Sequence, residues 1–294
     1  PAPDSLLTGS ADRTLKVWDL RREIALQTLA GHSDIITSCH VLPPGPLSDG
    51  PLALSTSWDR TLRLWDLTRG TLLRTLTGHS WFVTCCTVLP DGTRAVSGSW
   101  DRTLRLWDLH AGVPLKIMPC PTSQITCVAA FPDGRTVLSG GRDSLLRIWD
   151  LELGEVVATL RGHSDFITDC LVFREGDRLL AASASEDHTL KIWDLTRGDL
   201  RCTLHGHAAA VTACALTRDG RALVSVSADH TVRVWDIEKG ACMDTAYGVA
   251  PFDSVTATGG RICAGDRQGQ IWLLVSASVG GPSPPTSRHA PGKG

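Results

Sequence analysis

Four sets of His, Ser, Asp and Trp recur along the 294 residues of this chain. In every set the Asp lies four residues after the Ser, and the Trp lies six residues after the Asp. The sets are His32, Ser55, Asp59 and Trp65; His79, Ser97, Asp101 and Trp107; His163, Ser183, Asp187 and Trp193; and His207, Ser225, Asp229 and Trp235. A His that is held by a carboxylate can deprotonate a hydroxyl, so each set contains the side chains of a serine hydrolase.

The repetition of the sets argues against a hydrolase. Four identical triads do not make one active site, and no Gly-x-Ser-x-Gly sequence leads from a strand into a helix. No Cys or His pair has the spacing of a zinc site. We therefore expect a protein that is not an enzyme, with no catalytic residue, no metal and no cofactor.

A long internal repeat must position these residues. Near copies of one hexapeptide, each containing a Trp of the repeat, occur at 14–19, 61–66, 103–108, 145–150, 189–194 and 231–236. Their Trp residues lie 42 to 47 residues apart, and Trp272 follows 37 residues after Trp235. Apolar residues alternate with polar ones within each unit, and pairs such as Asp91-Gly92 are hairpin turn signals. Since about 42 residues can hold four short antiparallel strands, we expect an all-β array.

The order Gly-His, Asp and Trp-Asp in this repeat resembles the WD-repeat β-propeller family over roughly residues 5 to 275. The resemblance implies a seven-bladed β-propeller of four-stranded antiparallel blades, in which each repeat supplies strand d of one blade and strands a, b and c of the next. It also implies that His, Ser, Asp and Trp form a hydrogen-bonded tetrad inside each blade. More weakly, residues 263–272 are similar to the final repeat of propellers in NACHT-type signalling NTPases.

The two ends of the chain depart from the repeat. The propeller is expected to span 1–278, followed by a disordered Pro/Gly/Ser-rich tail at 279–294. A strand b at 5–10 comes first, so blade 1 lacks strand a. Blade 7 has candidate strands at 253–258, 261–265 and 270–275 and lacks strand d. We expect residues upstream of Pro1 in the natural protein to supply both strands, because a propeller closes by removing exposed edges.

Blade 4 departs from the tetrad pattern in another way. Cys120-Pro121 stands where the Gly-His pair belongs, although Ser139, Asp143 and Trp149 remain at the usual spacing. Because the tetrad His is missing, we expect this blade to be less rigid.

Three Trp are not explained by the repeat. The chain has ten Trp but only five Phe and one Tyr, and seven of the Trp occupy the strand c position. Trp58 and Trp100 precede the turn Asp of blades 2 and 3, and Trp81 and Phe82 follow the Gly-His pair of blade 3. The d–a and b–c loops of a propeller share its top face, so these four aromatic residues should converge there. Large aromatic side chains are frequent hot spots of protein interfaces.

Charged and aromatic residues continue around the same face. They are Arg142 and Glu186, which precede the turn Asp of blades 4 and 5, and Asp165 and Phe166 of a d–a loop. An aromatic sector with one cation and several acids suits a peptide with apolar and basic residues. The alternative is that the Trp side chains only pack on turn residues such as Arg60 and Arg102.

Composition excludes several other classes of protein. The net charge of −2 and the pI near 6.6 give no excess of cations, so we expect no nucleic-acid partner. No apolar run reaches the roughly 18 to 20 residues of a membrane span, so no membrane insertion is expected. The ten Cys contain no C-x-x-C pair and suit a reducing compartment, which predicts the cytoplasm, with the nucleus as the alternative.

These observations predict a non-catalytic scaffold for protein-protein interactions. Its partner would be a peptide or protein bound at the top face, and the chain would be a module of a larger chain or complex. The alternative is a ligand-sensing or autoinhibitory propeller of a multidomain signalling NTPase, although the chain has no Gly-x-x-x-x-Gly-Lys-Ser/Thr loop.

Overall fold

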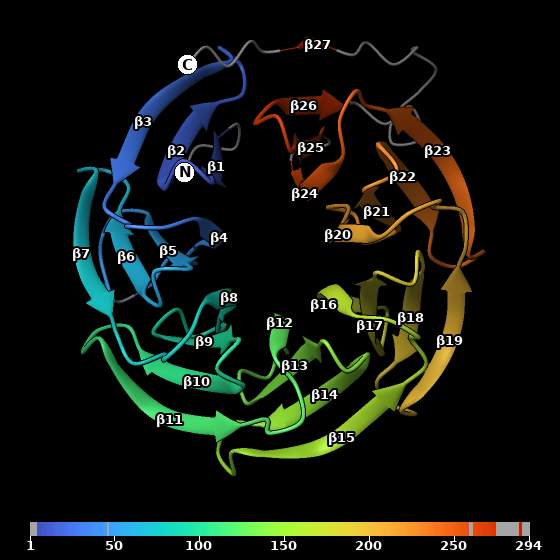
Figure 1. The fold of residues 1–294 in the computed structure, drawn as a ribbon, viewed down its shortest axis with the longest axis horizontal. Helices are drawn as coiled ribbons and strands as arrows, with labels where there is room; N and C mark the ends of the chain where they lie inside the picture. The colour runs from blue at the N-terminus through green and yellow to red at the C-terminus, as the bar shows by residue number, and fades with distance from the viewer. Residues whose placement is uncertain (1–4, 46, 259–260, 275–287, 290–294) are drawn as a thin grey trace. The chain divides into compact units, whose positions relative to one another are not determined.

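The computed structural model describes residues 5–45, 47–258, 261–274 and 288–289 (Figure 1). These residues form strands and turns, and no helix occurs among them. The strands pair into antiparallel sheets, each of which is one blade of a seven-bladed β-propeller. The all-β fold expected from the repeat is therefore confirmed.

The chain divides into two compact units, and the first of these spans residues 1–159. Its blades are formed, in order, by β1 (Ser5–Gly9), β2 (Thr14–Asp19) and β3 (Ile24–Ala30); by β4 (Ile36–Val41), β5 (Leu52–Ser57), β6 (Leu62–Asp66) and β7 (Thr71–Leu76); by β8 (Val83–Val88), β9 (Arg94–Ser99), β10 (Thr103–Asp108) and β11 (Val113–Pro119); and by β12 (Ile125–Ala130), β13 (Thr136–Gly141), β14 (Leu145–Asp150) and β15 (Glu155–Arg161).

The second unit spans residues 160–294 and contains the last two residues of β15 together with blades 5 to 7. These blades are formed by β16 (Ile167–Glu175), β17 (Arg178–Ser185), β18 (Leu190–Asp194) and β19 (Asp199–Leu204); by β20 (Val211–Leu216), β21 (Ala222–Ser227), β22 (Thr231–Asp236) and β23 (Ala241–Tyr247); and by β24 (Phe252–Thr258), β25 (Arg261–Asp266), β26 (Ile271–Leu274) and the two-residue β27 (Arg288–His289).

Blades 1 and 7 are incomplete among the described residues, as the sequence predicts. Blade 1 has three strands, which take the places of strands b, c and d. In blade 7, β24, β25 and β26 match the predicted spans within one residue at each end. Only β27 follows, pairing with β26 over two residues, and the rest of the predicted tail lies outside the described residues.

The middle strands of blades 2 to 6 form the core because both of their faces are covered. All six residues of β5 and of β21 are buried, which explains their runs of Leu, Ala, Val and Ser. The repeat Trp packs against apolar residues of a neighbouring blade; Trp107 of blade 3, for example, lies in one cluster with Leu54 and Leu64 of blade 2.

A bulge at the start of strand a links one blade to the next. In β4, β8, β16 and β20 the pairing with strand b shifts by one residue, and the extra residue is a Thr. Its hydroxyl donates to a carbonyl at the start of the next blade: Thr37 to Val83 at 2.8 Å, Thr84 to Ile125 at 2.8 Å, Thr168 to Val211 at 2.6 Å, and Thr212 to Phe252 at 2.7 Å. The equivalent Thr126 hydroxyl of blade 4 is buried and has no hydrogen-bond partner in the described part of the chain.

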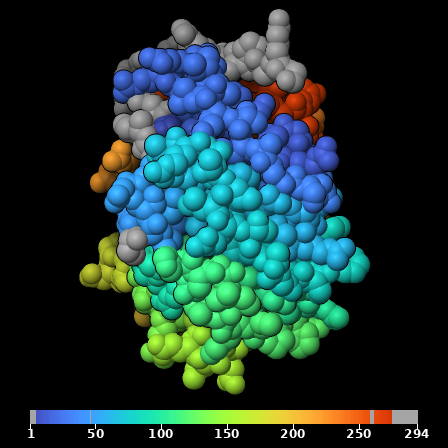
Figure 2. Space-filling model, turned by 90° about the vertical axis from the view of Figure 1, so that its left-hand side faces the viewer, coloured from blue at the N-terminus to red at the C-terminus, as the bar shows by residue number. Residues whose placement is uncertain are grey.

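The outer strands are the most exposed part of each blade. In the first unit, β3, β7 and β11 lie on the side that Figure 2 shows, from blue to green. Their exposed large apolar residues include Leu26, Leu72, Val113, Leu115 and Ile117. Because the outer strands expose these side chains, the middle strands supply the continuous core of blades 2 to 6.

Candidate functional site

The structure joins the four residues of each predicted tetrad in one chain of hydrogen bonds, from Asp to His to Ser to Trp. In blade 3, His79 Nδ1 lies 2.7 Å from Asp101 Oδ2, and His79 Nε2 lies 2.7 Å from Ser97 Oγ. Trp107 Nε1 donates to the same Ser97 Oγ at 2.8 Å. Because an ionised carboxylate only accepts, the imidazole donates from Nδ1 and, when neutral, accepts the Ser hydroxyl proton at Nε2.

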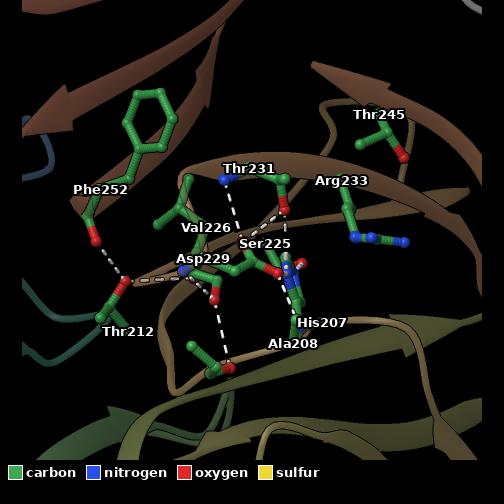
Figure 3. Close-up of polar contacts among 12 residues, drawn as sticks. His207, Ala208, Thr212, Ser225, Val226, Asp229, Thr231, Arg233, Thr245 and Phe252 are labelled. Atoms are coloured by element: carbon green, nitrogen blue, oxygen red, sulfur yellow. Dashed lines mark hydrogen bonds and ion pairs between the residues drawn. The ribbon is translucent and has the colours of Figure 1, made fainter. Parts of the chain in front are cut away.

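Figure 3 shows the corresponding group in blade 6. His207 lies 2.9 Å from Asp229 Oδ2 and 2.7 Å from Ser225 Oγ. Thr231 adds a hydroxyl that donates to Asp229 Oδ1 at 2.6 Å, and Thr212 donates to the carbonyl of Phe252 in the next blade. The tetrad and the link between the blades thus lie in the same sheet.

The order of these contacts is that of a hydrolase triad, but the Ser hydroxyl cannot reach a substrate. The tetrad Ser residues, Ser55, Ser97, Ser183 and Ser225, are all 0% exposed. Each of their hydroxyls is bonded to both the His and the Trp of its tetrad. The geometry therefore supports a structural role for these residues.

Burial and hydrogen bonding set the charge of the tetrad groups. Burial alone would raise the pKa of Asp101, but bonds from His79, Thr103 and the Ser80 amide outweigh it and hold that pKa well below its usual range. Asp59 and Asp187 have pKa values lowered in the same way. Burial also lowers the pKa of His79, against the raising effect of Asp101. In blade 3 the stable form is thus a neutral His79 beside an ionised Asp101.

The tetrad Asp fixes the loops of the top face, the face formed by d–a loops and b–c turns. Asp101 Oδ2 accepts the amide of Ser80 from the d–a loop at 3.1 Å. Its Oδ1 accepts both the amide and the hydroxyl of Thr103 across the b–c turn, at 2.9 and 2.6 Å. One carboxylate therefore holds the two loops that carry Trp81 and Trp100.

Blade 4 replaces its missing His with an arginine. Arg147 Nη2 and Nη1 bind Asp143 Oδ2 and Oδ1 at 2.5 and 3.1 Å, and Nη2 also donates to Thr122 Oγ1 at 3.0 Å. Trp149 Nε1 still donates to Ser139 Oγ at 2.8 Å. Arg147 was not predicted from the sequence; the signal that could have found it is a turn Asp retained without its His.

In blades 1 and 7 the repeat Trp belongs to a shorter hydrogen-bond network. In blade 7, Trp272 Nε1 donates directly to Asp266 Oδ2 at 2.9 Å. In blade 1, Trp18 Nε1 donates to Thr8 Oγ1 at 2.8 Å. The indole N–H of every repeat Trp therefore has an acceptor, whatever the blade supplies.

The surplus aromatic residues meet on the top face of the first unit. We call Trp58, Trp81, Phe82 and Trp100 the aromatic cluster. Phe82 is its centre: its ring stacks on Trp58 at a centroid distance of 4.9 Å, lies 5.5 Å from Trp100, and meets Trp81 edge-on at 6.0 Å. The Trp58 and Trp100 rings are 6.5 Å apart.

Backbone hydrogen bonds fix the cluster from below. The amide of Trp58 donates to the carbonyl of Ile35, and the amide of Trp100 donates to the carbonyl of Phe82, both at 3.0 Å. Ser99 Oγ donates to the carbonyl of Trp81 at 3.3 Å. The b–c turns and d–a loops are thus joined at the positions that present the aromatic rings.

The cluster is not fully covered by its own members. Trp58, Phe82 and Trp100 are half-buried, whereas Trp81 is 54% exposed. The guanidinium of Arg142 lies 5.2 Å from the centroid of Trp100, and its Nη1 donates to Gln124 Oε1 at 3.1 Å. The predicted convergence of Arg142 with the aromatic residues is therefore present in the first unit.

The other three predicted binding residues belong to blade 5, in the second unit. The amide of Glu186 donates to the carbonyl of Phe166 at 2.9 Å, and the amide of Phe166 donates to Asp165 Oδ1 at 2.8 Å. Asp165 and Glu186 are exposed and Phe166 is half-buried. This loop pair has the same construction as the pair that carries Phe82 and Trp100 in blade 3.

The thiols do not form a second site. All ten Cys are free, and burial raises the pKa of Cys39 to about 12 and that of Cys263 to about 11, so these groups stay protonated at neutral pH. No cluster of three or more metal-ligating side chains occurs within the described residues. Nor does any described helix have the length and apolarity that a membrane span requires.

Comparison with known proteins identifies the repeat. The family model of the WD40 repeat, described as WD domain, G-beta repeat, matches six segments at 1–19, 24–66, 70–108, 112–150, 154–194 and 198–236. A search of curated proteins gives no match. The expected likeness of residues 263–272 to NACHT-type propellers has no support among these matches. The six matched segments cover most of the sequence, and the chain belongs to the WD40 repeat family.

Proposed function

We propose that this protein is a non-catalytic protein-interaction scaffold whose aromatic cluster binds a peptide or protein partner. WD40 propellers commonly serve as such scaffolds, and we propose that this one does so as a module of a larger chain or complex. The ten free thiols suit a reducing location, for which we propose the cytoplasm or, alternatively, the nucleus.

The exposure of Trp81 is the observation that carries the proposal. An aromatic side chain buries roughly 150–250 Å² when it is fully covered. With 54% of Trp81 exposed, a partner that covered it would gain roughly 2 to 3 kcal/mol at about 25 cal/mol per Å². An indole of this exposure next to half-buried Phe82 is typical of an interface anchor.

The rigidity of the supporting loops also favours binding. The loops of Trp81 and Trp100 are held by the Asp101 carboxylate and by the bonds from Ser99 and to Phe82. Binding at a site that is already ordered avoids the entropic cost of fixing loops and side chains. The cluster therefore has the features of a preorganised site.

A non-catalytic role agrees with the state of the possible nucleophiles. The tetrad Ser hydroxyls are buried and bonded on both sides, and burial raises the pKa of thiols such as Cys39 and Cys263. Neither group is activated and accessible, which a nucleophile must be.

The test compares Trp81→Ala with Tyr247→Ala, a control in which an even more exposed aromatic residue, at 76%, is removed from β23. Proteins retained by each immobilised variant are quantified, and binding of the purified partner is then measured by calorimetry. Trp81→Ala should weaken binding of the partner at least about tenfold, which is equivalent to about 1.4 kcal/mol of binding free energy. If the folded Trp81→Ala and Trp100→Ala variants retain every partner at wild-type affinity, the proposal is wrong.

A further inference from the structure

The exposed charges around the aromatic cluster are arginines. The b–c turns of blades 2, 3 and 4 each present one, Arg60, Arg102 and Arg142, and all three are exposed. Arg60 and Arg102 directly follow the turn Asp and have φ angles of 69° and 63°. The amides of Arg60 and Arg102 donate to the carbonyls of Ser57 and Ser99, so the turns fix the backbone positions from which these side chains extend.

The carboxylates of the same turns face inward. The side chains of Asp59 and Asp101 are each 4% exposed and bound to His32 and His79. Asp143 is clamped by the guanidinium of Arg147. A partner that approaches these turns therefore meets cations, although each turn contains one acid and one base.

One acid remains among the d–a loops of this region. Asp34 is half-buried, and its Oδ1 accepts the amide of Ile35 at 2.8 Å. The equivalent position in blade 3 is occupied by Trp81, since Ser57 and Ser99 donate to the carbonyls of Asp34 and Trp81 respectively. The cations thus outnumber the acids on this part of the top face.

Arg60 and Arg102 lie in the same b–c turns as Trp58 and Trp100, and Arg142 contacts the Trp100 ring. Arg142 lies over Trp100, and Arg102 Nη1 reaches the carbonyl of Pro121 in the next d–a loop at 3.4 Å. Arg60 is two residues from Trp58. No ion pair found in the described part of the chain involves Arg60 or Arg102.

We propose that the partner segment is acidic: an aromatic or aliphatic anchor that covers Trp81, flanked by carboxylates that pair with Arg60, Arg102 and Arg142. This inference rests on the proposed function and specifies its ligand. Charge-assisted bonds from guanidinium to carboxylate are strong and geometrically specific, and Arg is enriched at interfaces together with Trp. Such a segment has the opposite charge to the peptide with apolar and basic residues that the sequence suggested, because Arg60, Arg102 and Arg142 are the exposed charges of the b–c turns in blades 2, 3 and 4.

A nucleic acid is the less suitable occupant. Stacking rings and cations are also features of single-strand binding sites, but such sites need a groove of cations along the backbone, and this chain has a net charge of −2. Three arginines around one aromatic cluster better match a short peptide with a few carboxylates.

The test begins with a random twelve-residue phage-displayed peptide library selected on the whole protein. Peptides whose binding requires Trp81 are kept, by comparison with Trp81→Ala. We expect these peptides to contain an aromatic or large aliphatic residue with neighbouring Asp or Glu. Their affinity, measured by fluorescence anisotropy, should fall at least fivefold between 50 and 300 mM salt.

Charge reversal then tests the contacts. The double variant Arg60→Glu with Arg102→Glu should bind a selected peptide at least tenfold more weakly than wild type does. It should bind the counterpart of that peptide, in which Lys replaces the acidic residues, more tightly than wild type does. The matched control, Arg218→Glu with Arg221→Glu, makes the same change of charge in the exposed β20–β21 hairpin and should leave affinity within twofold. The single-stranded oligonucleotide dT12, as a further probe, should not bind in a Trp81-dependent way.

The outcomes separate the two proposals. Trp81-dependent peptides that are neutral or basic would overturn the acidic specificity and leave the scaffold function in place. Tight Trp81-dependent binding of dT12 in preference to acidic peptides would also overturn the proposed acidic specificity. If no selected peptide depends on Trp81, the use of the aromatic cluster as a peptide site fails, and the acidic specificity fails with it.

Discussion

Arg147 binds Asp143 in blade 4 through two N–H groups, at 2.5 and 3.1 Å, where a His binds the equivalent Asp in four other blades. The guanidinium is long enough to reach the turn from the middle of β14, and the Thr122 hydroxyl of the d–a loop also donates to Asp143 Oδ2, at 3.4 Å. The blade keeps the function of the tetrad Asp although Cys120-Pro121 has replaced the Gly-His pair.

Replacing Arg147 should therefore destabilise the protein more than replacing an exposed arginine. Arg147→Met leaves a largely buried carboxylate without its cation, which costs about 2 to 4 kcal/mol of unfolding free energy. Arg197→Met, a matched change at an exposed turn, should cost less than about 0.5 kcal/mol. Urea denaturation measures both. Equal effects of the two changes would show that the Arg147 ion pair contributes nothing.

Two of the tetrad histidines, His79 and His207, should make the protein sensitive to mild acid. Burial lowers the pKa of His79 and His207 in the folded state, so near pH 6.5 the unfolded chain binds more protons than the folded one. Their contribution is complete above that pH and is lost as the pH falls, before the tetrad Asp groups are protonated at lower pH. His79→Gln should reduce stability by about 1 to 3 kcal/mol at pH 7.5 and flatten the decline between pH 7 and 5. The control is His188→Gln, an exposed His; an identical pH profile for all three proteins would refute this account.

Asp169 should change the stability of the protein with pH in the opposite direction to the tetrad histidines. Burial raises its pKa to about 6, although its carboxylate accepts the amides of Cys170 and Cys214 at 2.8 and 2.9 Å. Between roughly pH 4 and 6 the folded state binds more protons, so this group reduces stability as the pH rises through that window. The stability of Asp169→Asn relative to wild type should therefore increase by roughly 2 to 3 kcal/mol from pH 4 to pH 7. Chemical denaturation of both proteins at the two pH values measures this difference in stability. A difference that is the same at pH 4 and pH 7 would contradict the raised pKa of Asp169.

The Thr bulges provide a pair of matched changes. Thr84→Val removes the hydroxyl that donates to Ile125 of the next blade and should cost about 1 to 2 kcal/mol. Thr126→Val removes a buried hydroxyl that has no partner in the described residues, so it should be neutral or stabilising. Thermal unfolding of the two variants distinguishes them. A larger loss for Thr126→Val would mean that this hydroxyl does have a partner.

Much of the fold was predictable from the sequence because the same residue pattern recurs along the chain. A single occurrence of the spacing from Ser97 to Asp101 to Trp107 would predict little about the fold. The same spacing recurs in several blades with a Gly-His pair before it, and this recurrence predicts the repeat. The position of the aromatic cluster was also predictable, since Trp58 and Trp100 occupy one position of the repeat and therefore one face of the blades.

The direction of charged side chains was not predictable in the same way. Arg105 and Arg147 occupy the same position relative to the repeat Trp, yet only Arg147 binds its turn Asp, because His79 already occupies that carboxylate in blade 3. The sequence also contains one Asp and one Arg in both the blade 2 and blade 3 turns. Only the structure shows that the Asp turns inward and leaves the Arg exposed.

The backbone contact beneath the aromatic cluster has a consequence for how such a surface can change. The residue before the turn Asp is joined to a d–a loop carbonyl through its amide, whether it is Trp58, Trp100, Arg142, Glu186 or Ala228. Because the amide makes the contact, the side chain at this position is free to vary without loss of that bond. Blades 2 to 6 thus each offer a replaceable position on a constant backbone, and a new recognition specificity can arise by single substitutions that leave this hydrogen bond intact.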